Sequence, residues 1–112
     1  MSEIIAFVSD FELGTRIAST AATHGGDVIF PESVDNLSGS ANILIIDLNR
    51  DEDEWMSMLN TLQLHFPQTI IVGYAERVLK SLHAKAKEAG CAWVFPQSSL
   101  IKNLPRLIEE EL

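Results

Sequence analysis

Five short apolar segments, separated by stretches with helical spacing, constrain the fold of this chain more than any other feature. The segments cover residues 4–8, 28–30, 43–46, 69–72 and 92–95. The first, third and fourth are almost continuously aliphatic, which is typical of strands buried on both faces of a parallel sheet. Because strands and helices alternate along the chain, right-handed crossovers would cover both faces of that sheet with helices. The pattern predicts a doubly wound α/β domain.

Helical periodicity fills most of the intervals between these segments. The predicted helices cover residues 10–24, 51–66 and 76–89 and a last stretch that carries Leu100 to Ile108. Gly25 and Pro67 should end the first two, and Pro105 predicts either a kink in the last helix or a later start. We expect fraying at Glu109–Glu111 and a short or irregular helix within residues 31–42. Five strands suit a flavodoxin-like parallel sheet with strand order 2-1-3-4-5.

Size and charge limit the classes of function. With 112 residues the chain should form a single domain over residues 1–112, and its net charge of −8 argues against nucleic-acid or anionic-membrane binding. The charge favours a basic protein partner or a bound cation, although a solvated acidic surface also explains it. The lone Cys91 excludes an internal disulfide. No basic leader or apolar run of about 20 residues is present, so we expect a cytoplasmic protein.

Two aspartates follow strands that the predicted topology makes neighbours. Asp10 follows the first strand and Asp47 ends the third. Ligands of such folds bind at the carboxyl ends of the strands, beside the switch point between the first and third. The two carboxylates could therefore repel each other or recruit a hard cation such as Mg²⁺. Asp is also a preferred residue at helix starts, so both could be caps, and the residues alone leave both interpretations open.

Three segments resemble the receiver domains of bacterial response regulators. Residues 6–17, Ala-Phe-Val-Ser-Asp-Phe-Glu-Leu-Gly-Thr-Arg-Ile, resemble their first strand and helix, which usually carry two acids at the strand end. The run Ile-Leu-Ile-Ile-Asp at 43–47 resembles the third strand with its terminal phosphoacceptor, and Glu-Ala-Gly-Cys at 88–91 resembles the segment before the fifth strand. The likeness covers the whole chain in order and spacing.

The resemblance implies roles for three residues of this chain. Asp47 takes the phosphoacceptor position, and Asp10 takes the second acidic position, which binds metal. Asn49 would offer its backbone carbonyl to the same cation.

Departures from the receiver pattern predict a degenerate site. The first acidic position is Ser9, the position expected to carry a hydroxyl is Gly73, and the position of the expected lysine is Phe95. Tyr74, which follows Gly73, would be a packed side chain or a surface switch. Arg50 or Arg77 could stand in for the lysine. We therefore expect no cofactor beyond weakly bound Mg²⁺.

These features favour a pseudo-receiver, a signalling module without enzymatic activity that binds a protein partner or a second copy of itself. The resemblance implies an interaction face formed by the helix at 76–89, the strand at 92–95 and the last helix, including Lys80 and Trp93. One alternative is a Mg²⁺-dependent phosphoacceptor of a two-component phosphorelay, phosphorylated on Asp47. Another is a small-ligand sensor that uses the crevice at the strand ends.

Overall fold

The computed structural model describes residues 2–32 and 41–110 of the chain and has a central parallel sheet. In chain order, the first half contains β1 (Ser2–Phe7), α1 (Phe11–Thr23), β2 (Gly26–Ile29) and β3 (Ile43–Asp47). The second half contains α2 (Glu52–His65), β4 (Ile70–Ala75), α3 (Lys80–Glu88), β5 (Trp93–Pro96) and α4 (Gln97–Glu110). The short helix expected within 31–42 falls largely on residues outside those described.

The predicted sheet topology is confirmed. The strand order is β2-β1-β3-β4-β5, and every neighbouring pair is parallel. Each residue of β3 is buried, as its continuous aliphatic sequence indicates for a central strand. The register aligns Phe7 of β1 with Ile46, and Asp47 with Tyr74 of β4. The carboxyl ends of β1, β3 and β4 therefore meet at one edge of the sheet.

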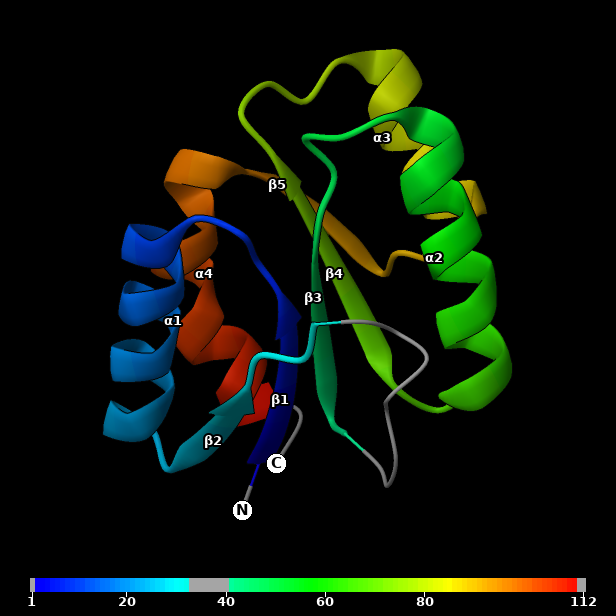
Figure 1. Ribbon diagram of the computed structural model, residues 1–112. Coiled ribbons are helices and arrows are strands. Elements are labelled where there is room, and N and C mark those ends of the chain that lie inside the picture. The colour runs from blue at the N-terminus through cyan, green and yellow to red at the C-terminus, as the bar shows by residue number, and fades with distance from the viewer. Residues whose placement is uncertain (1, 33–40, 111–112) are drawn as a thin grey trace.

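Two apolar layers cover the sheet (Figure 1). One layer lies under α1 and α4, and the other under α2 and α3. Side chains of β3 alternate between them, with Ile43 and Ile45 in the α1–α4 layer and Leu44 and Ile46 in the other. By this alternation Asp47 belongs to the α1–α4 side.

Helix boundaries agree with the sequence except in the second half of the chain. Gly25 adopts a φ of 78° after α1, the left-handed conformation expected of a residue that ends a helix. Helix α3 begins at Lys80 rather than at Glu76, because the Glu76 amide donates to the Asn49 side chain at 2.8 Å and so holds this segment against β3.

Helix α4 also differs from its prediction. It starts at Gln97, directly after β5, and continues through Pro105 to Glu110, so the expected later start and the fraying at Glu109 and Glu110 are wrong. The bond that Pro105 cannot make would have reached the carbonyl of Ile101, and both residues are only partly buried. Among residues 2–32 and 41–110, no helix has the length and apolar character that a bilayer crossing requires.

Candidate functional site

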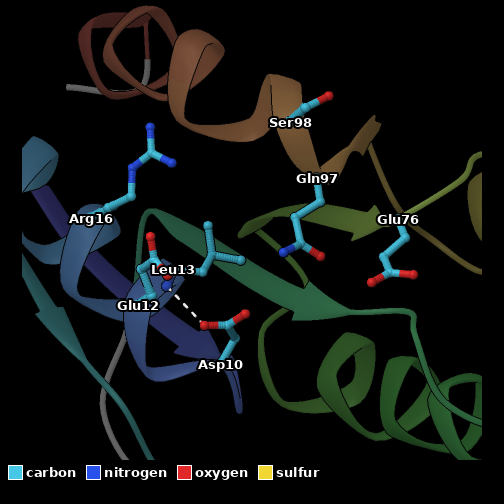
Figure 2. Close-up of a pocket in the computed structure, with 7 residues that line it drawn as sticks. All are labelled: Asp10, Glu12, Leu13, Arg16, Glu76, Gln97 and Ser98. Carbon is cyan, nitrogen blue, oxygen red and sulfur yellow. Dashed lines mark hydrogen bonds between the residues drawn. The ribbon is translucent and has the colours of Figure 1, made fainter.

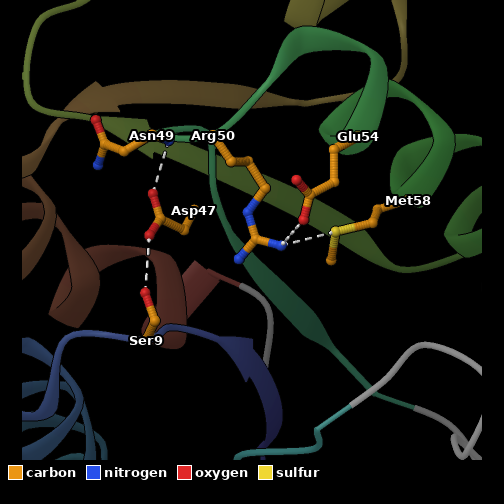
Figure 3. Close-up of polar contacts among 6 residues, drawn as sticks. All are labelled: Ser9, Asp47, Asn49, Arg50, Glu54 and Met58. Atoms are coloured by element: carbon orange, nitrogen blue, oxygen red, sulfur yellow. Dashed lines mark hydrogen bonds and ion pairs between the residues drawn. The ribbon is translucent and has the colours of Figure 1, made fainter.

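Asp47 is the buried polar centre of the strand-end edge. Its side chain is 7% exposed, the only buried charged residue in the described part of the chain. Its Oδ1 accepts a hydrogen bond of 2.7 Å from the backbone amide of Asn49, and Oδ2 accepts a weak one of 3.5 Å from the Ser9 hydroxyl (Figure 3). The chain thus supplies Asp47 with its own donors.

Asp10 caps helix α1. Its Oδ1 accepts a hydrogen bond of 3.1 Å from the Leu13 amide, and its extended backbone conformation is that of a helix N-cap. The helix-cap interpretation of Asp10 is therefore confirmed. Asp10 nevertheless lies close enough to the buried centre for its charge, like the charge of Asp47, to raise the pKa of Tyr74.

Asn49 joins three elements at this edge with its side chain. Its Oδ1 accepts from the Glu76 amide after β4, and its Nδ2 donates to Oε1 of Gln97 at the start of α4, at 3.4 Å. Its own amide holds Asp47. The sequence pointed to its backbone carbonyl as a metal ligand, but the clearest role of Asn49 here is as a structural clamp between β3, β4 and α4.

Tyr74, rather than Gly73, faces Asp47. The two residues are register partners on β3 and β4, and Tyr74 is 1% exposed in the α1–α4 layer. Burial raises the pKa of the Tyr74 phenol well above its usual range, and the Asp47 charge and a hydrogen bond to Asp47 raise it further. Arg50 opposes these effects. The side chain of this strand end that faces Asp47 therefore comes from Tyr74.

Gly73 points into the opposite layer. A Cβ built there would lie 2.8 Å from Cδ1 of Leu48 and 3.2 Å from Sγ of Cys91. A hydroxyl placed at residue 73 would therefore face the α2–α3 layer, away from Asp47. On a strand one residue changes the face, so Gly73 and Tyr74 point to opposite sides of the sheet.

The end of β5 is aromatic. Phe95 pairs with Tyr74 in register, is partly buried against the α1–α4 layer, and stacks on Trp93 with ring centroids 6.0 Å apart. Trp93 is 39% exposed, and the Lys87 ammonium lies 6.0 Å from its ring. The position of the expected lysine is thus part of an aromatic pair at the sheet edge.

Neither suggested substitute for the lysine is directed at Asp47. Arg50 donates to Oε1 of Glu54 at 3.3 Å and contacts Sδ of Met58 at 3.2 Å, so its guanidinium lies along α2 (Figure 3). Arg77 is exposed on the segment between β4 and α3.

The donor set does not fit a Mg²⁺ site. Mg²⁺ requires near-octahedral oxygen ligands, usually one or two carboxylates with several waters. Here one oxygen of Asp10 caps a helix, one oxygen of Asp47 binds the Asn49 amide, and Ser9 adds no charge. In the described ranges, no three His, Cys, Asp or Glu side chains gather in a group that could hold a metal ion.

Two pockets flank the start of α1. One, of about 390 Å³, lies towards α4 and is lined by polar groups that include Asp10, Arg16 and Glu76 (Figure 2). The other, of about 420 Å³, lies towards β2 and includes Phe11 and Phe30. Sequence reasoning missed this second pocket. The sequence did contain a signal, because Phe11 lies outside the apolar stripe of α1. In the structure its side chain is 88% exposed.

Solved structures with the same architecture are numerous, although no family model and no curated protein matches the sequence. A response regulator from Thermotoga maritima has a TM-score of 0.82 at 13% identity, over 97% of this chain and 98% of that one. A response regulator receiver domain protein from Clostridium thermocellum has a TM-score of 0.81 at 13% identity, over 99% and 94%.

A pilus assembly protein from Caulobacter crescentus has a TM-score of 0.77 at 16% identity, over 98% of each chain. This chain has the receiver fold. The fold that the sequence motifs implied is therefore confirmed, while the low identities leave its activity to be argued from the site.

Proposed function

We propose that this chain is a receiver-like signalling module that acts through protein–protein contacts and is not regulated by phosphorylation. One observation carries the proposal: the Asp47 carboxylate is held by donors of its own chain, while the end of β5 carries Phe95 instead of a cation. Removing one preorganised group from such a site typically reduces the rate by about 10²–10³. Because Phe95 supplies no charge to a phosphoryl group and Ser9 supplies no acid, transfer to Asp47 should be negligible.

A Mg²⁺-dependent phosphoacceptor is the second candidate. It is favoured by the position of Asp47 at the end of β3 with the Asp10 charge close by. A small-ligand sensor is the third, and the polar pocket of about 390 Å³ beside Asp10 favours it. Both alternatives use the same edge of the sheet, so one set of binding experiments separates them from the first.

The phosphorylation experiment uses acetyl phosphate, and beryllofluoride as a phosphoryl mimic, at millimolar Mg²⁺. We expect unchanged mass, tryptophan fluorescence and sedimentation in the wild type, and the same behaviour in Asp47→Asn. A stoichiometric mass gain that Asp47→Asn abolishes would favour the phosphoacceptor instead.

For the contact surface we propose α3, β5 and α4. Trp93 is a partly exposed aromatic on the edge strand β5, and Lys80 is exposed at the start of α3. Exposed tryptophans that a partner can bury are frequent sources of binding energy. We propose that either a second copy or another protein covers this face.

The surface experiment compares substitutions on the two sides of the molecule. Trp93→Ala and Lys80→Glu should weaken self-association in sedimentation, or the capture of a crosslinked partner. Phe11→Ala on α1 and Arg16→Glu are matched controls, since both residues are exposed and lie outside the proposed face. Equal losses in test and control variants would refute the assignment of the face.

A further inference from the structure

We propose that Tyr74 determines what Asp47 can bind, because its hydroxyl serves as an internal ligand of the carboxylate and occupies the approach that a cation or phosphoryl-like group would need. This inference rests on the proposed function. It names the residue that prevents Asp47 from binding a cation or a phosphoryl-like group. Tyr74 and Asp47 are register partners on adjacent parallel strands, and both side chains belong to the α1–α4 side of the sheet.

The phenol cannot easily leave this position. Tyr74 is 1% exposed within a layer that also holds Leu100 and Leu104 of α4. Interiors are packed as densely as organic crystals, so swinging the ring outward would require α1 or α4 to move. Tyr74 is therefore a fixed neighbour of Asp47 rather than a mobile surface switch.

The phenol competes with other groups for the carboxylate. A phenol O–H donates a proton to a carboxylate oxygen, and a cation or an electrophilic beryllium or phosphorus atom needs the lone pairs of the same carboxylate. Other donors of the chain also compete, because the Asn49 amide donates to Oδ1 at 2.7 Å and the Ser9 hydroxyl donates to Oδ2 at 3.5 Å. Burial, together with the charges of Asp47 and Asp10, raises the pKa of the phenol, so it stays protonated and remains a donor.

The sequence makes this contact measurable, because Tyr74 is the only tyrosine among the 112 residues. A chain labelled with ¹³C at the tyrosine Cζ gives one signal that needs no assignment by mutagenesis. Asp47→Asn should shift that signal, while Ser9→Ala, which removes only the weak bond at 3.5 Å, should shift it far less.

The decisive experiment measures beryllofluoride binding at millimolar Mg²⁺ in four folded proteins: wild type, Ser9→Asp, Ser9→Asp/Tyr74→Phe and the control Ser9→Asp/Cys91→Ala. Ser9→Asp supplies the missing acid, and Tyr74→Phe removes only the hydroxyl. The control removes the thiol of Cys91, which is buried against the same strand in the opposite layer. We expect binding in the Tyr74→Phe double variant to be about ten- to a hundredfold tighter than in the other three, the effect of one hydrogen bond to a charged group.

The possible outcomes distinguish an error in the proposed function from an error in the role of Tyr74. Binding by the wild type would refute the proposed function. An inert wild type with equal affinities in Ser9→Asp and Ser9→Asp/Tyr74→Phe would overturn only the role of Tyr74. If the double variant did not fold, the tyrosine signal would decide, and its insensitivity to Asp47→Asn would overturn the contact itself.

Discussion

The two halves of the strand-end edge are built from different chemistry. The half formed by β1 and β3 keeps its polar side chains, with Asp10 bound to the α1 amide of Leu13 and Asp47 bound to the amide of Asn49. The half formed by β4 and β5 is packed, with Tyr74 buried and Phe95 stacked on Trp93. On the proposed function, the retained acids form no binding site, because the opposite half supplies no cation and backbone amides already donate to one oxygen of each acid.

Substitutions in the two halves should have different consequences. Substitutions in the packed half should change the free energy of unfolding, since they alter buried contacts. Substitutions in the polar half should change binding or local bonding and leave most of the stability intact.

The largest effect is expected at Tyr74. Tyr74→Ala should lower the free energy of unfolding by about 3–5 kcal/mol, because it removes a buried aromatic ring and leaves a cavity. Urea denaturation measures the change, and Tyr74→Phe should cost less, about 1.5–3 kcal/mol, since the ring stays in place and only a hydrogen bond to a charged group is lost. A loss below about 1 kcal/mol for the alanine variant would mean that the ring is not packed as described.

A smaller effect is expected at Gly73. Gly73→Ser should destabilise by about 1–3 kcal/mol, because the new Cβ would lie 2.8 Å from Leu48. It should also leave beryllofluoride binding unchanged, since the hydroxyl would face the other layer. Gly14→Ala is the matched control: its Cβ would meet Phe30 at an ordinary 3.4 Å, and alanine favours the helix by about 0.5–1 kcal/mol. If Gly73→Ser gained beryllofluoride binding, residue 73 would not face the α2–α3 layer as described.

Gly73 is also an example of what could not be predicted from the sequence. The fold followed from continuous aliphatic strands such as β3 and from glycines and prolines at helix ends, signals that are local and strong. The same reasoning brought Asp10 and Asp47 to one edge, because parallel topology alone requires it. Which of two consecutive residues on β4 faces Asp47 depends on strand register, and the local sequence does not determine that register.

Long-range contacts could not be predicted from the sequence either. The shortened α3 follows from the Asn49 side chain holding the Glu76 amide, a contact across 27 residues that no helical periodicity encodes. Similarly, α4 continues through Pro105 because its apolar face, including Leu104 and Ile108, packs in the core. Tertiary contacts, polar for α3 and apolar for α4, outweighed the local preference in both helices.

The buried thiol of Cys91 should make the free energy of unfolding depend on pH in the alkaline range. Burial raises the pKa of its thiol to about 12, so the folded state holds the proton more tightly than the unfolded chain, whose thiol titrates near 9. Stability is therefore fully present below about pH 9 and falls as the pH rises towards 12. Urea denaturation at about pH 10 should show a loss of about 1–2 kcal/mol relative to about pH 7.

The control for this titration is Cys91→Ala, which should show a shallower decline because it removes the only thiol. Tyr74, with its pKa also raised, adds a further loss above about pH 10 in both proteins, by the same sign. Equal slopes in wild type and Cys91→Ala between about pH 8 and 10 would show that the thiol is not protected by burial.

The smallest effect is expected at Arg50, the cation of the polar half. Its ion pair with Glu54 is an i,i+4 pair at 3.3 Å whose glutamate side chain is 58% exposed, and such pairs contribute less than about 0.5 kcal/mol. Arg50→Gln should therefore leave the urea midpoint almost unchanged.

Arg50 is nonetheless the residue that could undo the contrast between the two halves, because a guanidinium released from α2 would give the polar half its own cation. If it stays bound to Glu54 and Met58, adding Arg50→Gln to Ser9→Asp/Tyr74→Phe should leave beryllofluoride affinity within about twofold, as should the exposed control Arg77→Gln. A loss of about tenfold or more with Arg50→Gln alone would show that the arginine turns towards Asp47 once the phenol is gone. In the wild type, the polar half would then lack only the space that Tyr74 fills. The positive charge that a bound phosphoryl-like group needs would already be present at Arg50, just before the start of α2.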